Sequence, residues 1–128
     1  MSNLRSPLSR ARGLGSAKHG VHHFWVQRLS AVALVPLALW FVFSVARLGN
    51  FGSGYAAAQH WVSAPSVAVA LVLFIGTALY HSALGIQVVI EDYVTSEASK
   101  LTLLVLSQFL HVIAGAAGVF AVLKVAFA

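Results

Sequence analysis

The sequence predicts an all-α membrane protein with three transmembrane helices, and three observations support this fold class. Hydrophobic residues make up 59% of the 128-residue chain and charged residues only 9%, where soluble globular proteins carry about 25%. The mean hydropathy is +0.87, and the apolar residues fall into three long uncharged stretches. A soluble domain this apolar would have to bury most of its residues, which a small chain cannot do because small domains are mostly surface.

The three stretches are residues 29–46, 66–90 and 101–123. A helix needs roughly 20 apolar residues to cross a bilayer, so each stretch is long enough. An isolated segment in hydrocarbon must satisfy its own backbone hydrogen bonds, which predicts helices rather than strands. Pro36 lies inside the first stretch, where a local kink is tolerated.

The distribution of Lys and Arg predicts the orientation. Six of these residues lie in the N-terminal segment or the second loop, and two lie on the opposite side: Arg5, Arg10, Arg12, Lys18, Arg28 and Lys100 against Arg47 and Lys124. By the positive-inside rule the N-terminus is cytoplasmic and the C-terminus periplasmic. The chain would then be a multi-pass protein of the bacterial inner membrane.

The chain divides into a basic cytoplasmic tail and interfacial segment, residues 1–28, and a three-helix membrane anchor, residues 29–128. Within the anchor, residues 47–65 are expected to form a glycine-rich loop, with Tyr55 and Trp61 at the membrane interface. The net charge of +5 lies mostly beside a hydrophobic span, which indicates topology rather than nucleic-acid binding.

The first twenty residues lack acids, as transit peptides do, but we expect a tail that rests on anionic headgroups. The chain has no cysteine, which excludes disulfides, thiolate metal sites and a thiol nucleophile.

Two histidines, His81 and His111, lie deep inside predicted spans. Each is about ten residues from the cytoplasmic end of its helix, or about 15 Å at the helical rise, and an ionisable group at that depth is a candidate functional residue. Neutral imidazole at mid-membrane suits a haem ligand, whereas a hydrogen bond to a neighbouring helix is the structural alternative. We expect the structural role for His111 and favour ligation for His81.

The residues that follow His81 favour ligation. Gly85 lies one turn further on the same helix face and leaves room where a flat macrocycle could pack. Asp92 is three helical turns from His81 and shares that face. The adjacent Tyr93 is either an interfacial anchor or a phenol that hydrogen-bonds a quinone carbonyl. Spacing alone leaves both roles open for Tyr93.

The stretch "KHGVHHFWVQRLSA", residues 18–31, carries His22, His23 and Arg28 at the start of the first span. One interpretation is a snorkelling arginine with an aromatic belt. The other is a cationic cluster that neutralises carboxylates at membrane depth, such as haem propionates.

Together with "HSALGIQVVIEDYV", this stretch resembles the small hydrophobic membrane-anchor subunit of succinate dehydrogenase (respiratory complex II). The family pattern has Gly, then His and an aromatic, then Arg before a small hydroxyl residue, and later His, Gly four residues on and an Asp-Tyr pair. The resemblance covers residues from about 19 to 128 and is similar in style to alphaproteobacterial members.

The resemblance implies a role for each matching residue. His81 would be an axial ligand to the iron of haem b, with the other ligand supplied by a second, partner anchor subunit. His22 and Arg28 would lie near the haem propionates, and Tyr93 and Asp92 in the ubiquinone site. The doubled histidine leaves open whether His22 or His23 is the residue beside the haem.

The implied function is the anchor of a succinate:ubiquinone oxidoreductase, in which flavoprotein and iron–sulfur subunits oxidise succinate and pass electrons to ubiquinone. The chain would be a non-flavin subunit of this enzyme and not catalytic alone. The alternatives are the anchor of a quinol:fumarate reductase, a non-catalytic three-helix scaffold, and a haem held by His81 and His111 within one chain. The sequence does not fix the direction of electron flow or the quinone type.

Overall fold

The computed structural model describes residues 7–11, 20–49 and 54–128 of the chain. The described residues form five helices: α1 (Pro7–Ala11), α2 (Gly20–Leu48), α3 (Tyr55–Ser63), α4 (Pro65–Tyr93) and α5 (Glu97–Ala126). The all-α prediction is confirmed, since α2, α4 and α5 are each long and apolar enough to cross a membrane. The residues of the predicted basic tail up to 6 and from 12 to 19 lie outside the described residues.

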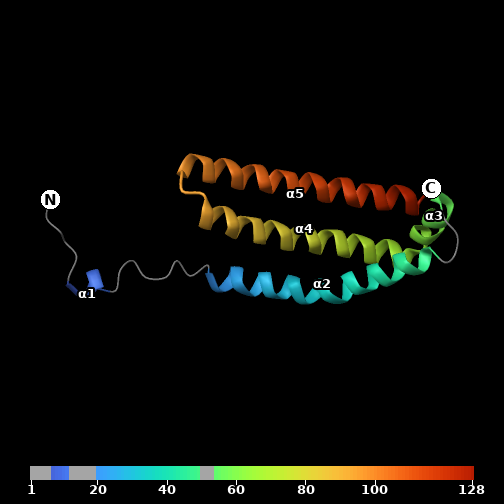
Figure 1. Cartoon of the computed structure of the whole chain (residues 1–128), viewed down its shortest axis with the longest axis horizontal. Helices are drawn as coiled ribbons and strands as arrows, with labels where there is room; N and C mark the ends of the chain where they lie inside the picture. The colour runs from blue at the N-terminus through green and yellow to red at the C-terminus, as the bar shows by residue number, and fades with distance from the viewer. Residues whose placement is uncertain (1–6, 12–19, 50–53) are drawn as a thin grey trace.

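The three long helices lie side by side, with α4 between α2 and α5 (Figure 1). Within the described residues the backbone of α4 lies close to both neighbours, while no Cα atom of α2 lies within 8 Å of one in α5. The chain reverses direction between α2 and α4 and again between α4 and α5. The start of α2, the end of α4 and the start of α5 therefore share one end of the bundle, called here the tail end.

α2 begins at Gly20, well before the predicted span at Leu29, and contains Pro36. The residues before Leu29 include Phe24 and Trp25, which suit the membrane interface, so the helix continues through that layer. A proline removes one helical hydrogen bond and clashes with the preceding turn. α2 is accordingly curved beyond its middle (Figure 1).

Helix α3 lies within residues 47–65, where the sequence predicts only a glycine-rich loop. The run of alanines after Tyr55 favours a helix, and Gly54 precedes it with φ 130°, a conformation open to glycine. α3 is held at the far end of the bundle by Trp61, whose ring stacks on Trp40 of α2 with centroids 6.1 Å apart. Trp61 therefore packs against the bundle rather than acting only as an interfacial anchor.

Helices α4 and α5 approach closely because α5 carries glycines at the contact. A Cβ added at Gly118 would lie 3.1 Å from Cγ2 of Ile75, and one at Gly115 would lie 3.5 Å from Cδ1 of Leu79. Small residues that let helix backbones approach are typical of transmembrane interfaces. The α2–α4 contact instead contains an aromatic stack of Phe41 on Phe74, with ring centroids 5.0 Å apart.

Very little of the described chain is fully buried. Ala68, Leu71 and Val122 form one buried cluster with partly buried side chains around it, and Ile90 is buried apart from that cluster. Large apolar side chains on all three long helices are exposed, among them Leu29 (70%), Phe43 (64%) and Phe120 (67%). Exposed apolar area of this extent is unfavourable in water at about 25 cal/mol per Å², which indicates that lipid or another apolar surface covers these faces.

Candidate functional site

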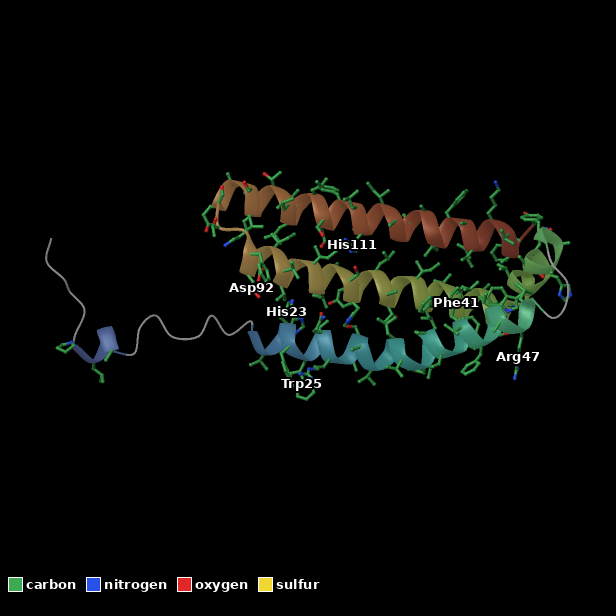
Figure 2. All side chains as sticks on the ribbon, viewed as in Figure 1. His23, Trp25, Phe41, Arg47, Asp92 and His111 are labelled. Atoms are coloured by element: carbon green, nitrogen blue, oxygen red, sulfur yellow. The ribbon has the colours of Figure 1, made fainter. Side chains whose placement is uncertain are left out.

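The tail end of the bundle gathers most of the residues that the sequence singled out. His22, His23 and Arg28 lie on the first turns of α2, and Asp92 and Tyr93 on the last turn of α4. Figure 2 shows His23 pointing from α2 toward α4, Asp92 at the end of α4, and Trp25 pointing away from the bundle. His81 lies further inside, on the part of α4 that faces α2.

His81 is held by a hydrogen bond between helices. Its Nδ1 lies 2.9 Å from Oγ of Ser30 on α2, and the imidazole is half-buried. Ser30 is buried, with 7% of its surface exposed. Within the described parts of the chain, Nε2 of His81 has no hydrogen-bond partner. His81 therefore makes the interhelical hydrogen bond that the structural alternative predicted, with one ring nitrogen only.

Gly85 lies on the same side of α4 as His81, as the sequence predicted, but it faces protein. A Cβ at Gly85 would lie 3.9 Å from Nε2 of Gln27 on α2. The glycine therefore adjoins the α2–α4 contact, and the space expected beside it for a macrocycle is occupied on this side by Gln27. Oε1 of Gln27 is buried and has no hydrogen-bond partner among the described residues.

Between the start of α2 and the end of α4 lies a hollow of about 530 Å³. It is lined by residues of both helices: Gly20, His22, His23, Val26, Tyr80, Leu84, Gln87, Val88 and Glu91. Nε2 of His23 is buried and has no hydrogen-bond partner among the described residues. Both tail histidines reach the hollow, and His23 is the more enclosed of the two.

Arg28 is not brought to this hollow. Its guanidinium lies over the ring of Phe24, 5.1 Å from the centroid, and the side chain is exposed. This cation–π contact one turn away on the same helix matches a snorkelling arginine at an aromatic belt. Of the three residues His22, His23 and Arg28, the two histidines line the hollow and Arg28 does not.

Asp92 and Tyr93 are exposed at the tail end, Tyr93 to 82%. α4 ends at Tyr93, and the chain continues in an extended conformation at Val94. The neighbouring Glu91 accepts a hydrogen bond from Nε2 of Gln87 at 2.8 Å. The exposed phenol and carboxylate are thus available to a molecule or subunit bound at this end.

His111 has the structural role that the sequence favoured. Its Nδ1 lies 2.7 Å from the carbonyl oxygen of Ser107 one turn earlier, and its Nε2 lies 3.2 Å from Oγ of Ser82 on α4. Figure 2 shows His111 between α5 and α4. Both ring nitrogens are occupied, one by a bond within α5 and the other by a bond that joins α5 to α4, whereas His81 bonds to α2. This arrangement does not favour a haem held by both histidines within one chain.

Three polar residues of these contacts were not predicted from sequence: Ser30 as the partner of His81, Ser82 as the partner of His111, and Gln27 beside Gly85. Each lies on an apolar helix opposite another polar group or a glycine. A hydroxyl or amide inside a span is a signal for an interhelical hydrogen bond, but its partner is known only once the helix order is known.

In the described parts of the chain, no group of three or more His, Cys, Asp or Glu side chains could hold a metal ion. A haem iron needs only axial ligands from protein, and an imidazole with Nδ1 engaged and Nε2 available has the form of such a ligand. His22 and His23 line the hollow, where an imidazole N–H can donate a hydrogen bond to a carboxylate. These residues fit a haem bound at the tail half of the bundle.

Comparison with known proteins identifies the family. The model of the succinate dehydrogenase/fumarate reductase transmembrane subunit matches residues 2–120. The chain belongs to this family. A succinate dehydrogenase hydrophobic membrane anchor subunit from Rickettsia bellii is 32% identical over 120 residues, which is 94% of each chain. The same subunit from Paracoccus denitrificans is 31% identical over 99 residues, which is 77% of this chain and 75% of the relative. No solved structure matches the chain.

Membership in the succinate dehydrogenase/fumarate reductase anchor family, together with three apolar helices, makes this a multi-pass protein of the bacterial inner membrane. The predicted resemblance to alphaproteobacterial succinate dehydrogenase anchors is confirmed by these relatives.

Proposed function

We propose that this chain is the hydrophobic anchor subunit of a succinate:ubiquinone oxidoreductase, that His81 binds the iron of haem b through Nε2, and that Tyr93 and Asp92 form part of a ubiquinone site. The observation that carries the proposal is the state of His81, with Nδ1 bonded to Ser30 and Nε2 without a described partner. The tail end would be cytoplasmic, as the excess of Lys and Arg there indicates.

The proposed partners come from the family to which the chain belongs. In the proposed complex a flavoprotein subunit and an iron–sulfur subunit oxidise succinate to fumarate on the tail side. A second anchor subunit would supply the other axial ligand. The exposed apolar faces of the long helices leave ample area for such a subunit within the bilayer.

Each residue of this chain has a defined task in the proposed mechanism. His81 holds and orients the haem, which supplies one-electron redox chemistry when bound. His22 or His23 donates a hydrogen bond to a propionate from the hollow between α2 and α4. Arg28 lies over Phe24 and does not line the hollow, so the geometry supports its assignment least.

At the quinone site the Tyr93 hydroxyl donates a hydrogen bond to a carbonyl oxygen of ubiquinone and orients the ring. Asp92 beside it passes a proton from the tail side toward that oxygen. Reduction of ubiquinone to ubiquinol takes two electrons from succinate oxidation and two protons from the tail side. The exposure of both side chains supports a site completed by another subunit.

The haem assignment is tested by the visible spectrum of the purified complex carrying His81→Tyr, with His111→Leu as the matched variant at similar depth. We expect His81→Tyr to abolish or alter the b-type spectrum and His111→Leu to preserve it. An unchanged spectrum in His81→Tyr removes the haem assignment, and loss of the spectrum in His111→Leu restores the single-chain alternative.

The quinone assignment is tested by Tyr93→Phe, with Tyr55→Phe as a control because Tyr55 is also exposed but lies on α3 at the far end. We expect Tyr93→Phe to lower succinate-dependent ubiquinone reduction at least about tenfold, in line with loss of a positioned proton donor. Reduction of an artificial dye by the soluble subunits should persist. Equal ubiquinone turnover in both variants would leave Tyr93 as an interfacial anchor.

A further inference from the structure

Ser30 combines three properties that no other described residue shares. It is the one buried polar residue in the described parts of the chain, with 7% of its surface exposed. Its Oγ lies 3.0 Å from the carbonyl oxygen of Gln27 on its own helix and 2.9 Å from Nδ1 of His81 on α4. The hydroxyl therefore joins two helices at the proposed haem ligand.

A serine hydroxyl has one hydrogen to donate and two lone pairs that accept. If the hydrogen goes to the Gln27 carbonyl, Oγ accepts a hydrogen bond from Nδ1–H of His81, and both contacts are satisfied by one hydroxyl. If the hydrogen goes to His81 instead, the contact with Gln27 is lost. The two distances together thus favour a donor chain from His81 through Ser30 to the backbone carbonyl of α2.

We propose that Ser30 is a positioning residue that fixes the proton of His81 on Nδ1 and orients the ring, so that Nε2 keeps its lone pair for the haem iron. The inference rests on the proposed haem ligation by His81. Metal-ligating histidines almost always donate their other ring N–H to an acceptor, which fixes the tautomer and raises the basicity of the ligand. Ser30 supplies that acceptor from within this chain.

His111 provides the contrast. Its Nδ1 also donates, to the Ser107 carbonyl at 2.7 Å, but its Nε2 accepts from the hydroxyl of Ser82 at 3.2 Å. A serine on a neighbouring helix therefore occupies the lone pair of His111, whereas the serine beside His81 leaves the Nε2 lone pair to a ligand. A histidine–serine pair thus connects two helices at both places. Only the pair of Ser30 and His81 leaves Nε2 for the proposed haem iron.

The test uses the purified membrane complex with Ser30→Ala, which removes the acceptor, and Ser30→Thr, which retains the hydroxyl. Ser44→Ala is the control for loss of a half-buried hydroxyl on the same helix. The measurements are haem content per flavin, the midpoint potential of the haem, and its low-spin electron paramagnetic resonance spectrum. His81→Tyr is measured in the same series.

We expect Ser30→Ala to weaken haem retention by about 10- to 100-fold, the usual effect of losing such a hydrogen bond to a metal ligand. The potential of the remaining haem should rise because the ligand donates less electron density. Ser30→Thr should keep the haem retention and the midpoint potential of the unmodified complex, and Ser44→Ala should change neither quantity. If Ser30→Ala does not assemble, Ser30→Cys keeps the volume with a weaker acceptor and carries the same expectation.

Two outcomes overturn the proposal and are distinguishable. If Ser30→Ala matches the unmodified complex in haem content, potential and spectrum while His81→Tyr loses its spectrum, the ligation stands and Ser30 has only a packing role. If His81→Tyr keeps the b-type spectrum, the ligation itself fails.

Discussion

Helix α4 is joined to α2 and to α5 by the same kind of contact, a hydrogen bond between a histidine and a serine. The two contacts differ in whether a ring nitrogen of the histidine is left without a partner. On the α2 side, Nδ1 of His81 is bonded to Ser30 and Nε2 has no partner among the described residues. On the α5 side, both nitrogens of His111 are bonded and glycines bring the backbones together. Both ring nitrogens of His111 are thus used, whereas the α2–α4 contact uses only one nitrogen of His81 and leaves Nε2 for the haem ligation proposed above.

The largest effect is expected from Gly118→Leu, which tests the close contact between α4 and α5. A Cβ at this position already lies 3.1 Å from Ile75, so a larger side chain must push α4 and α5 apart at a cost of about 1–3 kcal/mol. We expect a lower yield of assembled complex and a lower melting temperature. Ala117→Leu, on an exposed part of the same helix, is the control that should leave both nearly unchanged.

The next effect concerns the aromatic stack on the α2 side. Phe41→Leu keeps apolar volume but removes the stack on Phe74, which is worth about 0.5–1.5 kcal/mol beyond area burial. A small fall in melting temperature with an unchanged haem spectrum is expected, because Phe41 lies away from the tail end (Figure 2). A changed spectrum would mean that the whole α2–α4 contact, and not only its tail half, shapes the site.

The smallest effect is the coupling between His111 and Ser82. Hydrogen bonds between transmembrane helices contribute about 0.6 kcal/mol on average, so a double-mutant cycle of His111→Leu and Ser82→Ala should give a coupling energy of this order. Unfolding of the complex in a denaturing detergent series measures it. A coupling near zero would show that the 3.2 Å contact does not hold α5 against α4.

The sequence was sufficient for the three long apolar helices and for the placing of His81 and His111 inside two of them, because hydropathy alone marks such segments. It was not sufficient for α3, since a short alanine-rich helix has no membrane-length signal. It also did not predict that Arg28 would lie over Phe24, because a flexible side chain chooses among partners that only the fold places within reach. The role of Ser30 required knowing that α2 packs against α4 at that level.

The most direct test of the difference between the two histidines is ligand rescue in the purified complex. Replacing His81 or His111 with glycine leaves a space that free imidazole can enter. We expect His81→Gly to lose the low-spin b-type spectrum and to regain it as imidazole is added, while His111→Gly keeps the spectrum without imidazole. A normal spectrum in His81→Gly before imidazole is added would contradict the claim that this side of α4 provides the haem ligand.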